Sequence, residues 1–377
     1  MRVPISWIKK YTSLEGVPIE LIAEKLSMAG FEVEEVIDMS RNANGVVVGL
    51  VETVEKHPNA QKLSICKVGV GKEKPLQIVC GAPNVRPGQH VPVALVGAEL
   101  NKIGLTIKDN EIRGVSSSGM ICSLSELGLE NSSEGIAVLN DITTNKKLEV
   151  GSDVNRLLGL DDQILDIAIT ANRPDGMSII GIAKEISALI NKNTIEEDDN
   201  YKFDLVRRHE SKGNDEKFGN TVLYSLTLIE NVNNNVLLPE EIKDRLNKCG
   251  INVVNPIVDI TNYIMLQDGQ PLHAFDIDEL EKVTGEEVTK ESFSVCYAKT
   301  NEKFIGLDNK CIMLNEDILI VKCNKITVGI AGVMGSLIGS VKKSTRRVFI
   351  ESAVFPQQLI RNSSRTLGVR TESSSRF

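Results

Sequence analysis

The pattern of apolar and polar positions changes character several times along the chain. Residues 17–29, VPIELIAEKLSMA, place apolar side chains at helical spacing, and Gly30 is suited to end that helix in a left-handed conformation. The next stretch, FEVEEVID, alternates as a strand does. From Val46 to about Val150, short β-like runs are separated by Gly, Pro and Asn at intervals typical of a small barrel. The pattern therefore predicts a helix and a strand followed by a β-barrel.

The second half of the chain mixes strands and helices. Residues 162–192 predict a strand, a turn at NRPDG and a helix. Residues 193–218 are polar and rich in charge, which indicates a linker with some strand content. Beyond them, β-like runs alternate with shorter helices up to Phe377. The last residues, RTESSSRF, show neither a cap nor a turn, so we expect the chain to be part of a longer one.

Length and composition limit the class of protein. At 377 residues the chain is long enough for two or three domains, and 41% hydrophobic with 25% charged residues is typical of a soluble globular protein. The apolar runs are too short to cross a bilayer, and the start of the chain lacks the features of a signal peptide. Seven scattered cysteines without a CxxC pair argue against a zinc site or a disulfide framework, and favour a reducing cytoplasm.

Three stretches invite a catalytic or nucleotide-binding interpretation that their residues do not sustain. GVGKEK and GIAGVMGSLIGS match neither phosphate-loop pattern, so turns and close backbone packing are the better account of their glycines. Cys122 has no histidine nearby in sequence to act as its base, and a small buried apolar residue is the favoured role. We expect no metal site in the chain.

The stretch HPNAQKLSICKVGVG places His57, Asn59 and Lys62 around a turn before an alternating strand. Barrels of this kind often bind oligonucleotides, which makes a nucleic-acid contact one interpretation. However, residues 43–150 hold eleven Lys or Arg and eleven Asp or Glu, and the whole chain has a net charge of −8. Charge alone therefore favours a solvated loop, although a local basic patch stays open.

The stretch VDITNYIMLQDGQPLHAFD, residues 258–276, gathers polar side chains around the bend signal DGQP. It holds Thr261, Asn262, His273 and Asp276, with no obvious nucleophile. A hydrolytic site built from these residues would have to position water, whereas His273 taken alone is more simply a core histidine bonded to a carbonyl group.

Several longer motifs resemble one family. HPNAQKL, IVCGAPNVRPGQHVPVALVGA and GVSSSGMICSLSELGL resemble a tRNA-binding barrel that occurs within the bacterial phenylalanyl-tRNA synthetase beta subunit. SWIKKYT, EKLSMAGFEVEEV and LDIAITANRPDGMSIIGIAKEISAL resemble its N-terminal module. PIVDITNYIMLQDGQPLHAFD, GIAGVMGS and FIESAVFPQQLIRNSSRTLGVRTESSSRF resemble its editing region. Gln61 and Ser373 depart from the family pattern, which has an acidic residue and an alanine there.

The resemblance implies an α+β, multidomain fold. We expect an N-terminal α/β module, residues 1–40 and 151–200, interrupted by an inserted OB-fold barrel of residues 41–150. A mixed α+β editing domain of the B3/B4 type is expected over residues 201–377. Because 41–150 is an insertion, the two flanking segments are expected to pack together.

The resemblance also implies the activity. Such a subunit binds tRNA(Phe) and hydrolyses mischarged tyrosyl-tRNA(Phe), because an apolar synthetic pocket rejects an added hydroxyl group by only about a hundredfold. Aminoacylation is expected to need the alpha subunit, in an α2β2 heterotetramer, with ATP and Mg²⁺ used only by the complete enzyme. No cofactor is expected in this chain, and no membrane association.

The site residues follow by resemblance. Glu351 is expected to accept the phenolic hydroxyl group of tyrosine. Thr261, Asn262 and His273 are expected to orient the ester and hold the attacking water. Four further residues shape the pocket for the aromatic ring: Gly332, Gly335, Thr371 and Ser373.

Two alternatives remain. One is a tRNA-binding scaffold without hydrolytic activity, in which residues 201–377 serve as a structural or docking module. The other, a cysteine or serine hydrolase that uses His273, is weaker because no paired nucleophile motif is present.

Overall fold

The computed structural model describes residues 1–130, 132–143, 147–195 and 223–377. They form two compact units. The first unit comprises Met1–Val3, Trp7–Val33 and Ile167–Phe377, and the second comprises Pro4–Ser6 and Glu34–Asp166. The mixture of helices and strands in more than one unit confirms the predicted α+β, multidomain class. The predicted boundaries at 40, 150 and 200 stay predictions, and most of the stretch interpreted as a linker (193–218) lies outside the described residues.

The second unit is built around one antiparallel sheet with the strand order β10-β6-β3-β4-β5, in which β7 also pairs with β6. Two long strands in the middle carry most of the pairing, and β3 runs from Val46↔Ala94 to Leu50↔His90 alongside β6. The strands are β3 (Asn44–Lys56), β4 (Ser64–Gly69), β5 (Leu76–Cys80), β6 (His90–Leu100), β7 (Leu105–Thr106) and β10 (Met120–Ile121).

The paired strands form an open sheet, a half-barrel, and not the closed barrel that the sequence predicted. Between β5 and the residues before β10, single hydrogen bonds replace a ladder: the Ser118 backbone N–H donates to the Gln77 carbonyl at 2.8 Å, and the Gln77 side chain donates to the Ser116 carbonyl at 2.9 Å. A separate hairpin, β8 (Asn110–Ile112) with β9 (Val115–Ser117), lies next to β5. A short α-helix, α3 (Leu139–Ile142), and two 3-10 helices (Met39–Ala43 and Asn101–Ile103) complete the regular elements of this stretch in the described residues.

The strands that precede and follow the half-barrel in the sequence form a separate three-stranded sheet. Its order is β1-β11-β2, with β1 (Arg2–Pro4), β11 (Gln163–Ala168) and β2 (Glu32–Asp38). The helices that precede and follow these strands are α1 (Ile5–Ile8), α2 (Ile19–Met28) and α4 (Ile179–Leu189). Gly30 follows α2 with φ = 90°, as the sequence predicted for the end of that helix.

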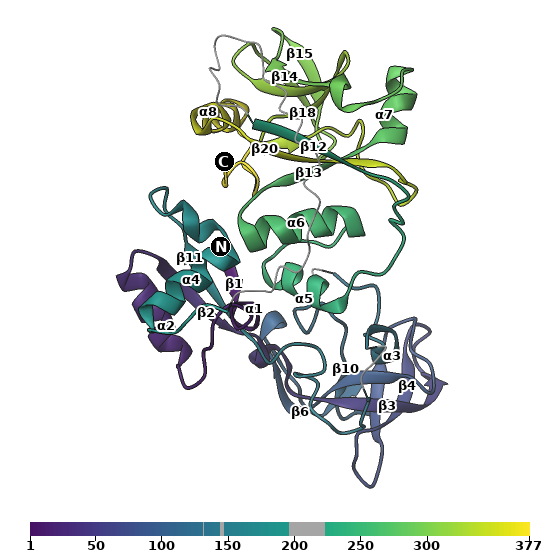
Figure 1. Ribbon diagram of the computed structural model, residues 1–377. Helices are drawn as coiled ribbons and strands as arrows, with labels where there is room; N and C mark the ends of the chain where they lie inside the picture. Colours follow the sequence, from purple (N-terminus) through teal and green to yellow (C-terminus); the bar gives the residue numbers. More distant parts are fainter. Residues whose placement is uncertain (131, 144–146, 196–222) are drawn as a thin grey trace. The chain divides into compact units, whose positions relative to one another are not determined.

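The rest of the first unit contains three sheets and the helices around them (Figure 1). One sheet has the order β12-β20-β13, a second has the order β14-β17-β18-β19, and the third consists of β15 and β16. The strands are β12 (Leu223–Ile229), β13 (Leu272–Asp276), β14 (Phe293–Tyr297), β15 (Glu302–Ile305), β16 (Cys311–Leu314), β17 (Leu319–Cys323), β18 (Ile326–Ile330), β19 (Met334–Gly335) and β20 (Val348–Val354); the helices are α5 (Glu240–Lys248), α6 (Pro256–Asp268), α7 (Ile277–Thr284) and α8 (Gln357–Leu367).

The central strand β20 separates two apolar layers. Side chains alternate between the faces of a strand, so Phe349, which belongs to the large core of this unit, shares a face with Glu351. The opposite face carries Val348, which packs with Ile257 of α6 and Ala274 of β13. Helix α6 therefore covers the face of the sheet away from Glu351 (Figure 1).

Four cysteines are buried, three in the second unit and one in the first. They are Cys66, Cys80, Cys122 and Cys323; Cys311 is exposed. Burial raises the pKa of Cys66 and of Cys122 to about 12, and that of Cys323 to about 11. Among the described residues, no helix is both long and apolar enough to span a membrane.

Candidate functional site

The 258–276 stretch forms a helix, a tight bend and a strand. Asn255 caps α6 by accepting a hydrogen bond from the Val258 N–H at 3.2 Å, and the helix ends at Gly269, whose φ of 82° suits glycine. After the bend, β13 pairs with β20 and places His273 directly opposite Glu351. The DGQP signal therefore serves to bring His273 beside Glu351.

Glu351 and His273 share one face of the sheet, and each is partly buried. Burial raises the pKa of Glu351 to about 7, and a hydrogen bond from Tyr224 acts in the opposite direction. Burial also lowers the pKa of His273 to about 4, so its imidazole is neutral at neutral pH. The pair therefore combines a carboxyl group that ionises near pH 7 with an uncharged ring.

Tyr224 was missed by the sequence analysis. It lies on β12, only 4% exposed, and its hydroxyl group donates to Oε2 of Glu351 at 2.8 Å. A signal was available, because LYSLTLI alternates and puts Tyr224 on the same face as the buried Leu226. A buried tyrosine needs a partner for its hydroxyl group, and the sequence does not say which.

Gly335 of β19, just after the turn that follows β18, packs against His273. A Cβ atom placed on Gly335 would lie 2.3 Å from Cε1 and 2.7 Å from Nε2 of the His273 ring, so only glycine fits there without a shift. The same ring packs against Phe275 in a T-shaped arrangement, with 4.7 Å between the ring centroids. These contacts fix the plane of the imidazole. Glycine-rich GIAGVMGS thus serves close packing, as expected.

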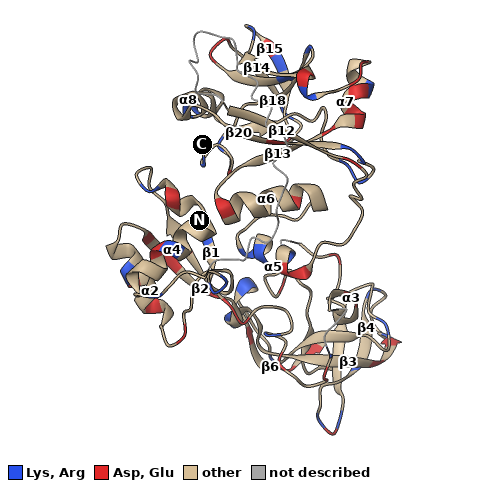
Figure 2. Cartoon of the chain, viewed as in Figure 1, with Lys and Arg blue, Asp and Glu red and all other residues tan. Residues whose placement is uncertain are grey.

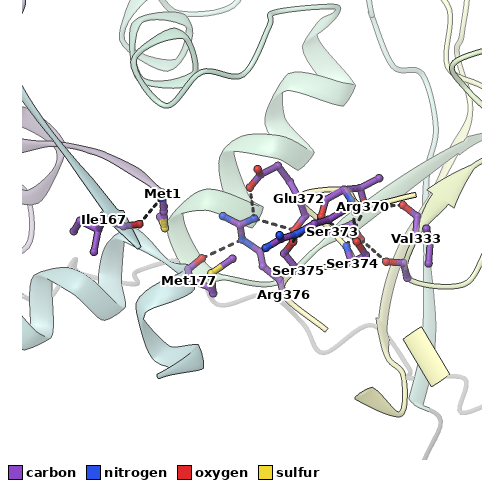
Figure 3. A network of polar contacts seen from close by, with 12 residues as sticks. Met1, Ile167, Met177, Val333, Arg370, Glu372, Ser373, Ser374, Ser375 and Arg376 are labelled. Atoms are coloured by element: carbon purple, nitrogen blue, oxygen red, sulfur yellow. Dashed lines mark hydrogen bonds and ion pairs between the residues drawn. The ribbon is translucent and has the colours of Figure 1, made fainter. Parts of the chain in front are cut away.

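The C-terminal segment is hydrogen-bonded to that same turn (Figure 3). The Thr371 hydroxyl group donates to the Val333 carbonyl at 2.8 Å, and the Ser373 hydroxyl group donates to the Gly332 carbonyl at 3.1 Å. Gly332 itself has φ = 65° and lies against Phe377. Ser373, a departure from the family pattern, therefore makes a bond that alanine cannot make. A turn at 371–375 occupies the stretch where the sequence indicated none.

Thr261 and Asn262 lie on helix α6, in a different layer from Glu351 and His273. The Thr261 hydroxyl group donates to the Val258 carbonyl of its own helix at 2.8 Å, and α6 packs on the sheet face that Glu351 does not share. The Asn262 amide makes no hydrogen bond with a residue in the described ranges. Contacts therefore link His273, Glu351, Gly332, Gly335, Thr371 and Ser373 into one region, whereas Thr261 and Asn262 are not joined to it by a described hydrogen bond.

The expected tRNA-contacting residues differ in their roles. The Asn59 N–H donates to Nδ1 of His57 at 3.0 Å, so Nε2 carries the ring proton and donates to the Ile112 carbonyl at 3.0 Å. The Asn59 amide donates to the Arg113 carbonyl, also at 3.0 Å. These two side chains hold the β8–β9 hairpin, while Lys62 is exposed. Acidic and basic residues are interspersed along the surrounding strands (Figure 2).

Cys122 does not have the environment of a nucleophile. The thiol is fully buried, and burial, with a smaller effect from the Glu126 carboxylate, raises its pKa to about 12. A reactive cysteine needs a lowered pKa and access to its substrate. The packing role favoured from the sequence fits both observations.

Two family models match the chain. Residues 46–151 match the model described as "Putative tRNA binding domain", and residues 221–377 match the B3/4 domain. The first match covers the half-barrel sheet, and the second covers the region of Glu351 and His273.

Curated relatives match the chain over its whole length. It is 50% identical over 381 residues to the phenylalanine–tRNA ligase beta subunit of Prochlorococcus marinus strain MIT 9313, and 49% identical over 378 residues to that of Synechococcus sp. strain CC9605. Each alignment covers 100% of this chain and 46% of the relative, so the chain spans about half the length of the curated relatives it matches.

A solved structure is also similar, though distantly. It is an N-terminal fragment of the phenylalanyl-tRNA synthetase beta subunit from Pyrococcus horikoshii, 15% identical, with a TM-score of 0.27 over 62% of this chain and 71% of that one. A TM-score this low adds nothing to the assignment. Since the identities over 100% of this chain and the two domain matches agree, the chain matches the family of phenylalanine–tRNA ligase beta subunits along its whole length.

Proposed function

We propose that this chain hydrolyses tyrosine esters of tRNA(Phe), with Glu351 as the acceptor of the phenolic hydroxyl group and with water as the nucleophile. The observation that carries the proposal is the hydrogen bond from the Tyr224 hydroxyl group to Oε2 of Glu351 at 2.8 Å. This carboxyl group accepts a phenol within the protein itself. A phenylalanine side chain would leave such an acceptor unpaired, which is the kind of difference that permits strong discrimination.

The state of His273 supports a role in placing water. A neutral imidazole has one nitrogen able to accept a hydrogen bond from water and another able to donate, and burial keeps His273 neutral over the physiological range. Because Gly335 and Phe275 fix the plane of the ring, those nitrogens have defined directions. An aminoacyl ester is already activated, so oriented water suffices without a covalent intermediate.

Thr371 and Ser373 support the pocket by holding the 332–335 turn through its carbonyl groups. By resemblance we assign to Asn262 the orientation of the ester carbonyl; its side-chain amide has no described partner and is free to donate, and it lies on α6, which packs on the sheet face that Glu351 does not share. Thr261 is assigned a place in the lining of the site through its position on α6, because its hydroxyl group is already hydrogen-bonded within the helix.

The half-barrel is the proposed tRNA-binding element, and Lys62 is the residue best able to contact a phosphate there, because it is exposed. His57 and Asn59 would act indirectly, by fixing the hairpin that lies beside the same loop.

The wider assignments extend the same proposal to the complete protein. We infer that it works with an alpha subunit as an α2β2 heterotetramer in the cytoplasm, and that aminoacylation with ATP and Mg²⁺ belongs to that assembly. We propose that hydrolysis needs no metal. Among the described residues, no three His, Cys, Asp or Glu side chains gather as a metal site would require.

The test is hydrolysis of tyrosyl-tRNA(Phe) and phenylalanyl-tRNA(Phe) by the assembled enzyme carrying wild-type or variant beta subunit. Glu351→Ala is expected to reduce the preference for the tyrosyl ester by roughly five- to a hundredfold, since it removes the partner of the phenolic hydroxyl group. His273→Ala and Asn262→Ala are expected to slow both esters together, because they act on the water and the carbonyl.

Two results would contradict the proposal in different ways. If Glu351→Ala slows both esters equally and keeps the preference, the carboxyl group belongs to the water-positioning residues. If the wild-type enzyme binds tRNA and hydrolyses neither ester, the chain is a tRNA-binding scaffold.

A further inference from the structure

The carboxyl group of Glu351 is flanked on both sides of its strand. On β20, Glu351 lies between Leu226 of β12 and His273 of β13. Tyr224 is two residues from Leu226 and lies opposite the small Ala353. A diagonal neighbour at this offset is within reach of an aromatic side chain, and the tyrosine crosses over Ala353 to the carboxyl group.

The two carboxyl oxygens of Glu351 are unequal. Oε2 accepts the hydrogen bond from Tyr224 at 2.8 Å, whereas Oε1 accepts none from a residue that the structure describes. Tyr224 is 4% exposed and its ring is tilted against Phe355, with 6.5 Å between centroids, so the hydroxyl group has little freedom to turn elsewhere. One carboxyl oxygen, Oε2, is therefore hydrogen-bonded within the protein, and the other, Oε1, is available to accept a hydrogen bond.

We propose that Tyr224 is a positioning residue, whose hydroxyl group occupies Oε2 and so presents Oε1 of Glu351 to the phenolic hydroxyl group of the bound tyrosyl ester. The inference rests on the proposed function and names a residue that sets its specificity. The hydroxyl group of Tyr224 does not touch the substrate. It fixes the rotation of the carboxyl group and stabilises the ionised form, which is the stronger acceptor.

The groups around the Glu351 carboxyl group determine in which direction its pKa shifts, and so how the preference for the tyrosyl ester changes with pH. His273 faces it from β13 and is neutral above about pH 4, Tyr224 faces it from β12, and Cys323 of β17 lies near Tyr224 with a raised pKa. The 332–335 turn contributes no ionisable side chain. Since the Tyr224 hydrogen bond lowers the pKa of Glu351 from the value that burial alone would give, its loss must raise that pKa.

The experiment compares Tyr224→Phe with wild type in the assembled enzyme. Rates of hydrolysis of tyrosyl-tRNA(Phe) and phenylalanyl-tRNA(Phe) are measured from pH 5.5 to 9, and their ratio is plotted, which cancels the effect of hydroxide on both esters. In wild type the ratio is expected to fall as pH drops through about 7. In Tyr224→Phe the midpoint is expected about one pH unit higher, the effect of losing one hydrogen bond to a charged group.

Two controls make the assignment specific. Tyr263→Phe also removes one phenolic hydroxyl group, which accepts from Arg245 at 2.7 Å, and it is expected to leave the midpoint unchanged. Glu351→Gln is expected to give a low ratio that does not change with pH. If Tyr224→Phe assembles poorly, replacing Tyr224 with 3-fluorotyrosine, a stronger hydrogen-bond donor of nearly the same shape, is expected to move the midpoint downward.

An unchanged midpoint in Tyr224→Phe, or a higher tyrosine preference at every pH, would overturn the inference. The second result would mean that Tyr224 competes with the substrate for the carboxyl group. Either outcome leaves the proposed function standing, because wild type would still prefer the tyrosyl ester. A wild-type enzyme that hydrolyses neither ester would overturn both.

Discussion

At the residue scale, the candidate site depends on how closely backbone and side chains approach. The ring of His273 lies where a Cβ atom of residue 335 would be, and Gly335 pairs with Gly329 on the neighbouring strand. These two glycines are partners in the ladder but have different surroundings. A Cβ atom on Gly329 would meet nothing closer than 3.6 Å, which is an ordinary contact. Only at Gly335 do the surrounding atoms leave no room for a side chain.

Gly335→Ala is therefore expected to displace the His273 ring and to reduce hydrolysis of both esters by roughly ten- to a hundredfold, as small misplacements of catalytic groups do. Gly329→Ala is the matched control and should change the rates by no more than about twofold. Rates are measured on both charged tRNAs with the assembled enzyme. Equal rates for the two variants would show that the position of the ring does not matter for hydrolysis.

The sequence drew attention to part of this region, and the roles expected for its residues stay predictions. The bend signal DGQP marked the turn before His273, and resemblance supplied the expected roles of His273 and Glu351. Neither could supply the bond from Tyr224 to Glu351, which joins residues 127 positions apart. Strand alternation tells which face a side chain takes, whereas the partner across the sheet depends on the register between β12 and β20.

At the element scale, α6 links the bend before β13 to the rest of its unit. Its cap is shared, because Oδ1 of Asn255 accepts from the Val258 N–H and also from the Asn234 amide at 3.1 Å. Asn255 is 9% exposed and Asn234 is 1% exposed, so loss of the shared acceptor would leave a buried amide without one of its partners. The cap therefore fixes both the start of the helix and the loop beside it.

Asn255→Ala is expected to destabilise the first unit by about 1–2 kcal/mol, the usual cost of losing an N-cap side chain. Trp7, the single tryptophan of the chain, stacks on Tyr263 of α6 with 4.8 Å between ring centroids, so its fluorescence reports on the packing of this helix. Urea unfolding followed by that signal gives the measurement. Asn233→Ala, which removes an exposed turn bond to Asn235, is the control and should stay within about 0.5 kcal/mol of wild type.

The type of an element was predictable from the sequence where its apolar spacing was regular. Whether the strands close into a barrel was not predictable. The helix over 17–29 and the strand–turn–helix over 162–192 appear as α2 and as β11 with α4, because apolar spacing and Gly or Pro signals agree there. Closure between β5 and β10 depends on single bonds such as Ser118 to Gln77. Alternation along a strand carries no information about whether its two edge strands will form a ladder.

At the scale of the whole molecule, the described residues form two compact units, and each contains hydrophobic clusters of its own. One core contains Phe275, Phe293 and Phe349, while the half-barrel has its own clusters around Leu100 and Val68. The similarity to phenylalanine–tRNA ligase beta subunits covers 100% of this chain and therefore extends over both units. Separate cores allow each unit to open without the other.

The buried thiols make such opening measurable by alkylation. In the native state, Cys66, Cys122 and Cys323 are closed to iodoacetamide and hold their protons, so each is labelled only when its unit opens. Exposed Cys311 is expected to be labelled at once. Mass spectrometry at increasing urea should give one labelling rate for Cys66 and Cys122 and another for Cys323. A single common rate at every urea concentration would mean that the two units open together; two rates would give each unit its own opening free energy, read from cysteines that the chain already carries.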